Sequence, residues 1–218
     1  VLMTLEDRLW RETRRWDFTD LPFVRAVRDG TCSVTGLQAY ALDLVTLTQG
    51  FTRQLSWILA HCDDRVVRHA VLANLLEEEG VVSFKAHDGL VAPLGRAHGE
   101  MACRLARAFG ADPDIPRPPL RSAWLDGALQ RGNWLAALAF MTVGYEANVP
   151  AVFRSLVEGL RTHYGYSEAD IEYLVMHITA DEEHGADGVA MVARLGVTPE
   201  AERNALEGAR RGTLSWYQ

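Results

Sequence analysis

Hydrophobic positions repeat with helical spacing along nearly the whole chain, and no segment shows the alternation typical of a half-buried strand. Ser33 or Thr35 is the expected N-cap of a long helix, and Thr198 with Pro199 is the expected start of the last one. Glycines, prolines and short polar stretches divide the pattern into helical ranges at 3–16, 19–29, 35–62, 64–79, 81–94, 95–109, 119–130, 133–163, 167–195 and from Thr198 onward. The pattern predicts one all-α domain over residues 1–218, a bundle of about seven or eight helices.

Length, composition and net charge favour a folded protein and argue against several classes of partner. A chain of 218 residues with 48% apolar and 23% charged residues has the length and composition of a folded protein that needs no disulfide. The net charge of −7 argues against nucleic acid or an anionic membrane as a partner. We expect a cytoplasmic protein without a signal peptide or transmembrane helix, because no apolar run is long enough and the three cysteines form no CxxC pair. Lys85 is the only lysine, which disfavours Schiff-base chemistry.

The segment MHITADEEHGADG places three metal-binding side chain types on one helical face. Asp181 and His184 follow His177 by four and seven residues, which puts them about 40° and −20° away from it around the helix. Two imidazoles and a carboxylate on one face are able to bind a metal ion. A solvated polar face remains the alternative.

Glu146 stands in an otherwise apolar stretch, AALAFMTVGYEANVPAVF. A carboxylate buried there needs a cation or strong hydrogen-bond donors. Pro150 follows four residues later and cannot donate to the carbonyl of Glu146, so the helix is expected to kink or bulge at the acid. Such bulges are frequent at functional sites. A buried pair with an arginine is the other interpretation.

Three consecutive glutamates form the third candidate feature. Glu77, Glu78 and Glu79 point in three directions, so one or two at most face inward. Glu78 and His87 would lie half a turn out of phase on a straight helix, and they could share a metal only if the helix breaks, for which Gly80 is the candidate position. Glu77 and Glu79 remain rivals of Glu78, and an exposed acidic turn is the simplest alternative.

Three histidines and three carboxylates suit two divalent iron or manganese ions, and no cysteine is among them. The candidate ligands are Glu78, His87, Glu146, His177, Asp181 and His184.

These motifs, NLxxEExG followed by His87, then YExxxP and HxxxDxxH, resemble those of the haem-oxygenase-like diiron oxidases and oxygenases. The similarity covers about residues 21–190 and implies the seven-helix bundle shared with haem oxygenase, thiaminase-like proteins and the pyrroloquinoline quinone synthase. By position it implies the same six ligands, two Fe(II) ions or manganese, and dioxygen as co-substrate. The six residues would then also be the catalytic ones. We further expect a homodimer that acts on a small-molecule substrate.

Within that family the chain also resembles the self-sacrificing para-aminobenzoate synthase, but it departs from it at two positions. Val24 and Leu156 stand where that enzyme has its consumed tyrosine and its lysine. The expected substrate is therefore an added amino acid or carboxylic acid that undergoes oxidative C–C or C–N cleavage, desaturation or oxygenation, in the biosynthesis of a specialised metabolite or cofactor. One alternative is a metal-free thiaminase-like hydrolase or quinone-synthase-like oxidase, with Cys62 or Cys103 as a thiol. Another is a helical partner protein without catalysis.

Overall fold

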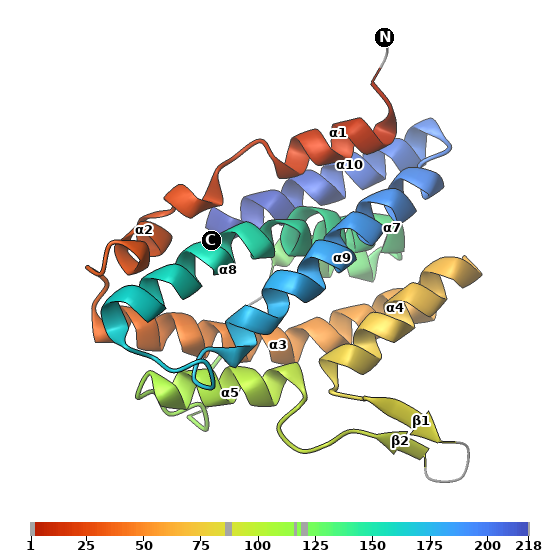
Figure 1. Cartoon of the computed structure of the whole chain (residues 1–218). Helices are drawn as coiled ribbons and strands as arrows, with labels where there is room; N and C mark the ends of the chain where they lie inside the picture. Colours follow the sequence, from red (N-terminus) through yellow and green to blue (C-terminus); the bar gives the residue numbers. More distant parts are fainter. Residues whose placement is uncertain (1–2, 86–88, 116, 119–121, 218) are drawn as a thin grey trace. The chain divides into compact units, whose positions relative to one another are not determined.

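The structure is a computed structural model that describes residues 3–85, 89–115, 117–118 and 122–217 (Figure 1). The predicted all-α class is confirmed, with one short hairpin added. The helices are α1 (Leu5–Thr13), α2 (Pro22–Arg28), α3 (Val34–His61), α4 (Arg65–Glu78), α5 (His98–Ala108), α6 (Ala123–Gln130), α7 (Trp134–Leu138), α8 (Val149–Gly159), α9 (Glu172–Leu195) and α10 (Pro199–Leu214). Short 3-10 turns lie at Phe18–Asp20, Glu146–Asn148 and Ser215–Tyr217, and π-helical segments at Ala139–Tyr145 and Leu160–Tyr164.

The prediction of a helix over 81–94 is wrong. Strands β1 (Ser83–Lys85) and β2 (Gly89–Val91) pair antiparallel there, with Ser83 opposite Val91. Gly80 has a φ of 69°, a left-handed conformation that ends α4 and redirects the chain. The apolar residues that follow it therefore belong to an extended segment.

The described chain forms two compact units, each discontinuous in sequence. The first unit comprises Val1–Gly30, Ser122–His163 and Leu174–Gln218, and the second comprises Thr31–Arg121 and Tyr164–Tyr173. Because contacts within a unit join distant segments, neither unit can be read as a block of consecutive helices. The predicted single domain over the whole chain stays a prediction.

In the second unit, α4 and α5 both pack on the long helix α3 (Figure 1). The predicted cap of α3 is Ser33, whose hydroxyl accepts a hydrogen bond from the amide of Gly36 at 3.1 Å. The side chain of Gln38 donates to the carbonyl of Phe109 at 3.2 Å, and Arg104 donates to Glu172 at 2.8 Å. These bonds connect α5 to the start of α3 and to the segment that leads into α9.

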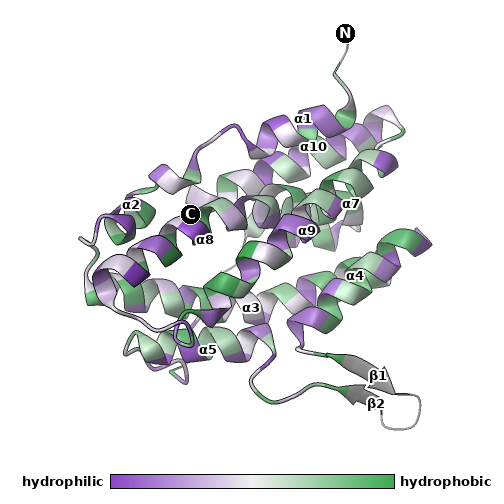
Figure 2. Cartoon of the chain, in the orientation of Figure 1, coloured by the Kyte–Doolittle hydropathy of each residue, from purple (hydrophilic) through white to green (hydrophobic). Residues whose placement is uncertain are grey.

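In the first unit, α10 lies along α1 and packs closely on α7 and on the π-helical stretch Ala139–Tyr145, here called the π segment. Figure 2 shows a mainly hydrophobic ribbon around α7, whereas α1 and α10 mix both kinds of residue. Glycines allow this approach: a Cβ on Gly144 would lie 2.6 Å from the Cα of Gly212, and a Cβ on Gly208 would overlap the backbone of Ala136. The most apolar part of the chain is thus covered by its last helix.

One stretch, Trp134–Tyr164, is long and apolar enough to cross a membrane by composition alone. Its most apolar window is 83% buried within the protein. That burial is the property of a core helix.

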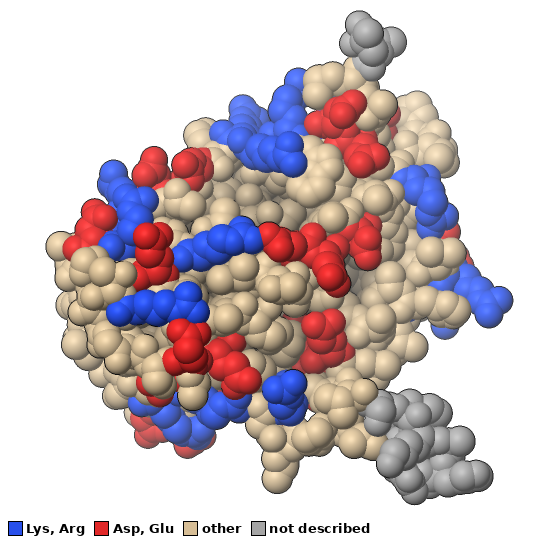
Figure 3. Space-filling view, in the orientation of Figure 1, with Lys and Arg blue, Asp and Glu red and all other residues tan. Residues whose placement is uncertain are grey.

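Charged side chains occur in small mixed groups on the face drawn in Figure 3. Many form ion pairs within one unit, such as Arg211 with Glu207 at 2.7 Å and Arg107 with Asp114 at 3.1 Å. Exposed pairs of this kind contribute little to stability, so the fold depends on its packed core.

The helix contact at Gly212 is testable. We expect Gly212→Ala to lower the free energy of unfolding by about 1–3 kcal/mol, because the added methyl would meet the carbonyl of Phe140 and the Cα of Gly144. The matched control is Gly50→Ala in α3, where a Cβ meets nothing within 4 Å. It should raise stability by about 0.5–1 kcal/mol. Urea denaturation of both variants measures this, and equal effects would contradict the packing argument.

Candidate metal centre

Glu146 sits where the regular helix gives way. Its amide donates to the carbonyls of Met141 and Thr142 at the end of the π segment, and a 3-10 turn at Glu146–Asn148 follows. The predicted break at this acid is confirmed. Pro150, four residues on, has no amide proton to donate to the carbonyl of Glu146, which explains the break. The Glu146 residue is 3% exposed, so the bulge places a carboxylate in the core of the first unit.

Two residues of α9 converge on this carboxylate. The ligand atoms of Glu146, Asp181 and His184 all lie within 4.8 Å of one another. Asp181 is buried and His184 is half-buried, and the Nδ1 of His184 is 3.5 Å from an Asp181 carboxylate oxygen. Two carboxylates and an imidazole therefore meet within the reach of one metal ion.

Small residues bring α9 to this position. A Cβ on Gly185 would lie 2.7 Å from the Cα of Ala147, and a Cβ on Gly188 would overlap the side chain of Thr142. Since Gly185 directly follows His184 and Ala147 directly follows Glu146, this backbone contact sets the spacing between the two ligand-bearing segments.

His177 lies on the same helix, two turns before His184. It is 7% exposed, and its ring meets the ring of Phe153 edge to face, with centroids 6.0 Å apart. Glu182 and Glu183 are exposed. The predicted stripe of His177, Asp181 and His184 on one inward face of α9 is therefore confirmed.

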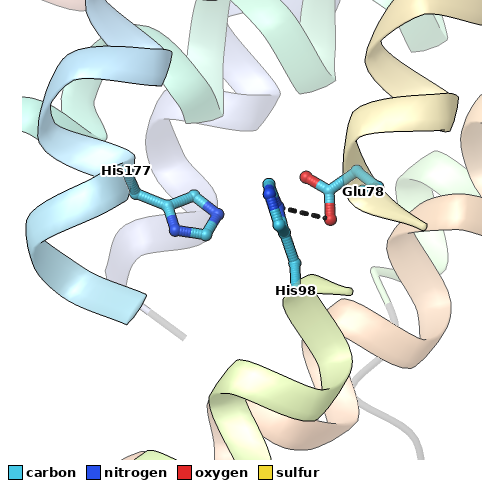
Figure 4. A group of neighbouring side chains, drawn as sticks. All are labelled: Glu78, His98 and His177. Carbon is cyan, nitrogen blue, oxygen red and sulfur yellow. Dashed lines mark ion pairs between the residues drawn. The ribbon is translucent and has the colours of Figure 1, made fainter. Parts of the chain in front are cut away.

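The second unit carries another carboxylate–imidazole pair. Of the three consecutive glutamates, Glu78 is buried whereas Glu77 and Glu79 are exposed, as the sequence predicted. Figure 4 shows the carboxylate of Glu78, at the end of α4, facing His98, the first residue of α5. The Nδ1 of His98 is 3.0 Å from an oxygen of Glu78. Figure 4 also draws His177 of α9.

His98 is the residue that sequence reasoning missed. His87, the predicted partner of Glu78, lies outside the described residues. A signal for His98 was present: Met101 and Leu105, three and seven residues later, are buried on the same face of α5. Helical phase alone would have placed this histidine in the core.

A pocket of about 550 Å³ within the second unit reaches Glu78. Its walls include Glu78, the threonines Thr48 and Thr52 of α3, and Gly99 and Arg104 of α5. A small molecule can therefore approach Glu78 from within this unit.

The donor chemistry of both groups fits a divalent transition metal such as iron. Carboxylates and imidazoles are the ligands of non-haem iron, and burial strengthens the need of Glu146 and Asp181 for a positive partner. No sulfur donor belongs to either group.

The cysteines are poor nucleophiles in this structure. Burial raises the pKa of the Cys62 thiol and of the Cys103 thiol above the ordinary range, which lowers the fraction of reactive thiolate at neutral pH. This disfavours the thiaminase-like alternative.

Comparison with known proteins agrees with the donor chemistry. A protein-family model described as "Iron-containing redox enzyme" matches residues 38–217. A protein named 4-aminobenzoate synthase from Chlamydia muridarum is 27% identical over the whole chain and 89% of its own length. One of the same name from Chlamydia trachomatis is 28% identical over 83% of the chain and 75% of its own length.

Solved structures show the same fold. A TenA homolog from Pseudomonas syringae has a TM-score of 0.72 at 12% identity, over 98% of this chain and 88% of its own. A domain with a heme oxygenase-like fold from Shewanella denitrificans has a TM-score of 0.70 at 15% identity, over 100% and 90% of the two chains. The predicted haem-oxygenase-like fold is confirmed.

The glycine contact beside the first group can be tested. In Gly185→Ala the new methyl would lie 2.7 Å from the Cα of Ala147 and must push the two segments apart, so we expect weaker iron binding at Glu146, Asp181 and His184. Anaerobic ferrous titration measures the affinity. Gly50→Ala serves as the control, and an unchanged affinity in a folded Gly185→Ala protein would refute the role of this contact.

Proposed function

Because the chain belongs to the family of iron-containing redox enzymes and is an oxidoreductase, we propose that it is a non-haem diiron enzyme that uses dioxygen to oxidise an added small molecule. The observation that carries this proposal is the buried group of Glu146, Asp181 and His184, a carboxylate-rich donor set at a helix bulge. Bound iron would supply one-electron redox chemistry with dioxygen.

We assign the first ferrous ion to Glu146, Asp181 and His184. We assign the second to Glu78 and His98 of the second unit. His177 stays a predicted iron ligand. Support for the second assignment comes from the buried Glu78–His98 pair and from the family membership. His87 stays a predicted ligand of this ion.

The chain's own residues prepare these sites in three ways. The carboxylates of Glu78, Glu146 and Asp181 offset most of the charge of two ferrous ions. The neutral imidazoles bind without adding charge. Phe153 packs against His177 and limits the access of water to that ring, which fixes its orientation.

The proposed substrate is a separate small amino acid or carboxylic acid. Two relatives are named 4-aminobenzoate synthase, which is compatible with chemistry on small aromatic or amino-acid compounds. Val24 is 3% exposed and Leu156 is 1% exposed, and these apolar core residues offer no group that could be consumed in a reaction. The pocket beside Glu78 has room for a molecule of this size.

We expect the purified chain, loaded anaerobically with ferrous iron, to bind close to two irons. Glu78→Ala should lower this to about one, because a buried ligand is lost, whereas Glu79→Ala should still bind two. The matched change at Glu79 removes the same charge one residue away on the exposed side of α4. Metal analysis after gel filtration gives the stoichiometry.

Saturation of the wild-type chain at one iron would exclude the diiron assignment. Loss of iron in Glu79→Ala, with Glu78→Ala intact, would shift the ligand by one residue while leaving the iron chemistry in place.

A second expectation concerns self-modification. Incubation with ferrous iron, dioxygen and excess ascorbate should leave the intact mass of the protein unchanged and release no aromatic amine. The reason is that Val24 and Leu156 carry no group to donate. Intact-protein mass spectrometry checks this, and a stoichiometric loss of a side chain would show that the chain is its own substrate.

A further inference from the structure

A continuous series of aromatic rings crosses the first unit. Tyr145 stacks on Trp216 with ring centroids 4.8 Å apart and planes inclined by 13°. Trp216 stacks on Phe18 at 5.7 Å, and Phe18 meets Tyr217 at 5.5 Å. Tyr217 meets Trp16 edge to face at 6.0 Å. Every ring in the series is therefore in contact with the next.

The two ends of this series lie in different environments. Tyr145 is the last residue of the π segment and directly precedes Glu146, so its backbone adjoins a proposed iron ligand. At the other end, Tyr217 is 54% exposed and Trp16 is 43% exposed. The series thus runs from the buried bulge to solvent.

Four of the five rings belong to the side chains that lose an electron most readily, tyrosine and tryptophan. Transfer of an electron between such rings slows steeply with distance, and stacked rings in contact keep each step short. Phe18 does not take part in redox chemistry, but its ring contacts both Trp216 and Tyr217, which are consecutive residues.

The buried environment of the Trp216 indole favours reversible one-electron oxidation. Its indole N–H is buried and has no hydrogen-bond acceptor among the described residues. An oxidised Trp216 would therefore keep its proton, remain a radical cation and return to its starting state on gaining one electron.

We propose that Tyr145, Trp216, Tyr217 and Trp16 form a one-electron relay that connects the Glu146 end of the iron site to an external reductant at the surface. The proposal rests on the proposed function, since the oxidant at the inner end is iron oxidised by dioxygen. The relay would let the enzyme recover when an oxidising equivalent is formed without substrate.

The electrons and protons balance at each step. Tyr145 would give one electron to iron held at Glu146 and would release its phenolic proton to solvent. Trp216 then gives one electron to the tyrosyl radical, which takes up a proton, and Tyr217 or Trp16 reduces Trp216 in turn. A surface tyrosine or tryptophan radical is finally restored by one electron from a small reductant such as ascorbate or a thiol, together with a proton from water.

The test compares Trp216→Phe with a matched control, Trp124→Phe. Trp124 is also half-buried and stacks on a ring of the same π segment at 5.7 Å, but that ring is Phe140, which is neither a tyrosine nor a tryptophan. Each full-length protein is loaded with iron and exposed to dioxygen without substrate or reductant. Peptide mass spectrometry then measures oxygen incorporation at Trp16 and Tyr217, and freeze-quenched electron paramagnetic resonance measures the radical.

We expect oxidation at Trp16 and Tyr217 to fall severalfold in Trp216→Phe and to stay at the wild-type level in Trp124→Phe. Circular dichroism confirms that both variants are folded. Equal surface oxidation in all three proteins would overturn the relay, because it would show that the rings only pack the end of α10 onto the core.

An iron-free arm separates the relay from the proposed function. Photogenerated tris(bipyridine)ruthenium(III) oxidises exposed aromatic residues of the metal-free protein, and the relay should carry the oxidation inward to Tyr145. Its oxidation should fall severalfold in Trp216→Phe. If this arm succeeds while no iron binds, the relay stands and the diiron proposal fails; if iron binds but neither arm depends on Trp216, only the relay is overturned.

Discussion

The burial of one carboxylate shapes the first unit. Glu146 is 3% exposed in the most apolar part of the chain, where an isolated negative charge is costly. The fold gathers partners around it instead: a carboxylate and an imidazole from α9 lie within 4.8 Å. Two acids side by side increase the need for a cation, which supports the proposed metal site.

The position of that carboxylate depends on interrupted helical geometry and on glycine. The π segment and the 3-10 turn shift Glu146 out of the regular helical phase. Gly185 and Gly188 allow α9 to approach this irregular backbone, and Gly212 allows α10 to cover it from another helix. Because the contact of Gly185 is with the backbone of Ala147, a methyl group there would change the distance between the two ligand-bearing segments. The close packing of the helices therefore also sets the positions of the candidate metal ligands.

In the second unit, a buried carboxylate is positioned by the end of a helix. Left-handed Gly80 stops α4 just after Glu78, and α5 begins at His98 beside it. Both side chains of the pair are buried, and a pocket reaches Glu78. Burial also raises the pKa of the Cys62 and Cys103 thiols, which lowers their thiolate fraction at neutral pH.

The sequence by itself determined the helical class, the inward stripe of α9 and the break at Glu146. Each of these follows from local rules, namely helical phase, the missing amide proton of proline and the conformational freedom of glycine. Only the tertiary structure decided which residues meet. It paired Glu78 with His98, grouped Glu146 with Asp181 and His184, and stacked Tyr145 on Trp216, 71 positions away in the numbering. It also replaced a predicted helix at 81–94 with a hairpin. The reason is physical: periodicity reports which face of an element is buried, whereas the partner across that face is set by backbone approach between segments that are distant in sequence.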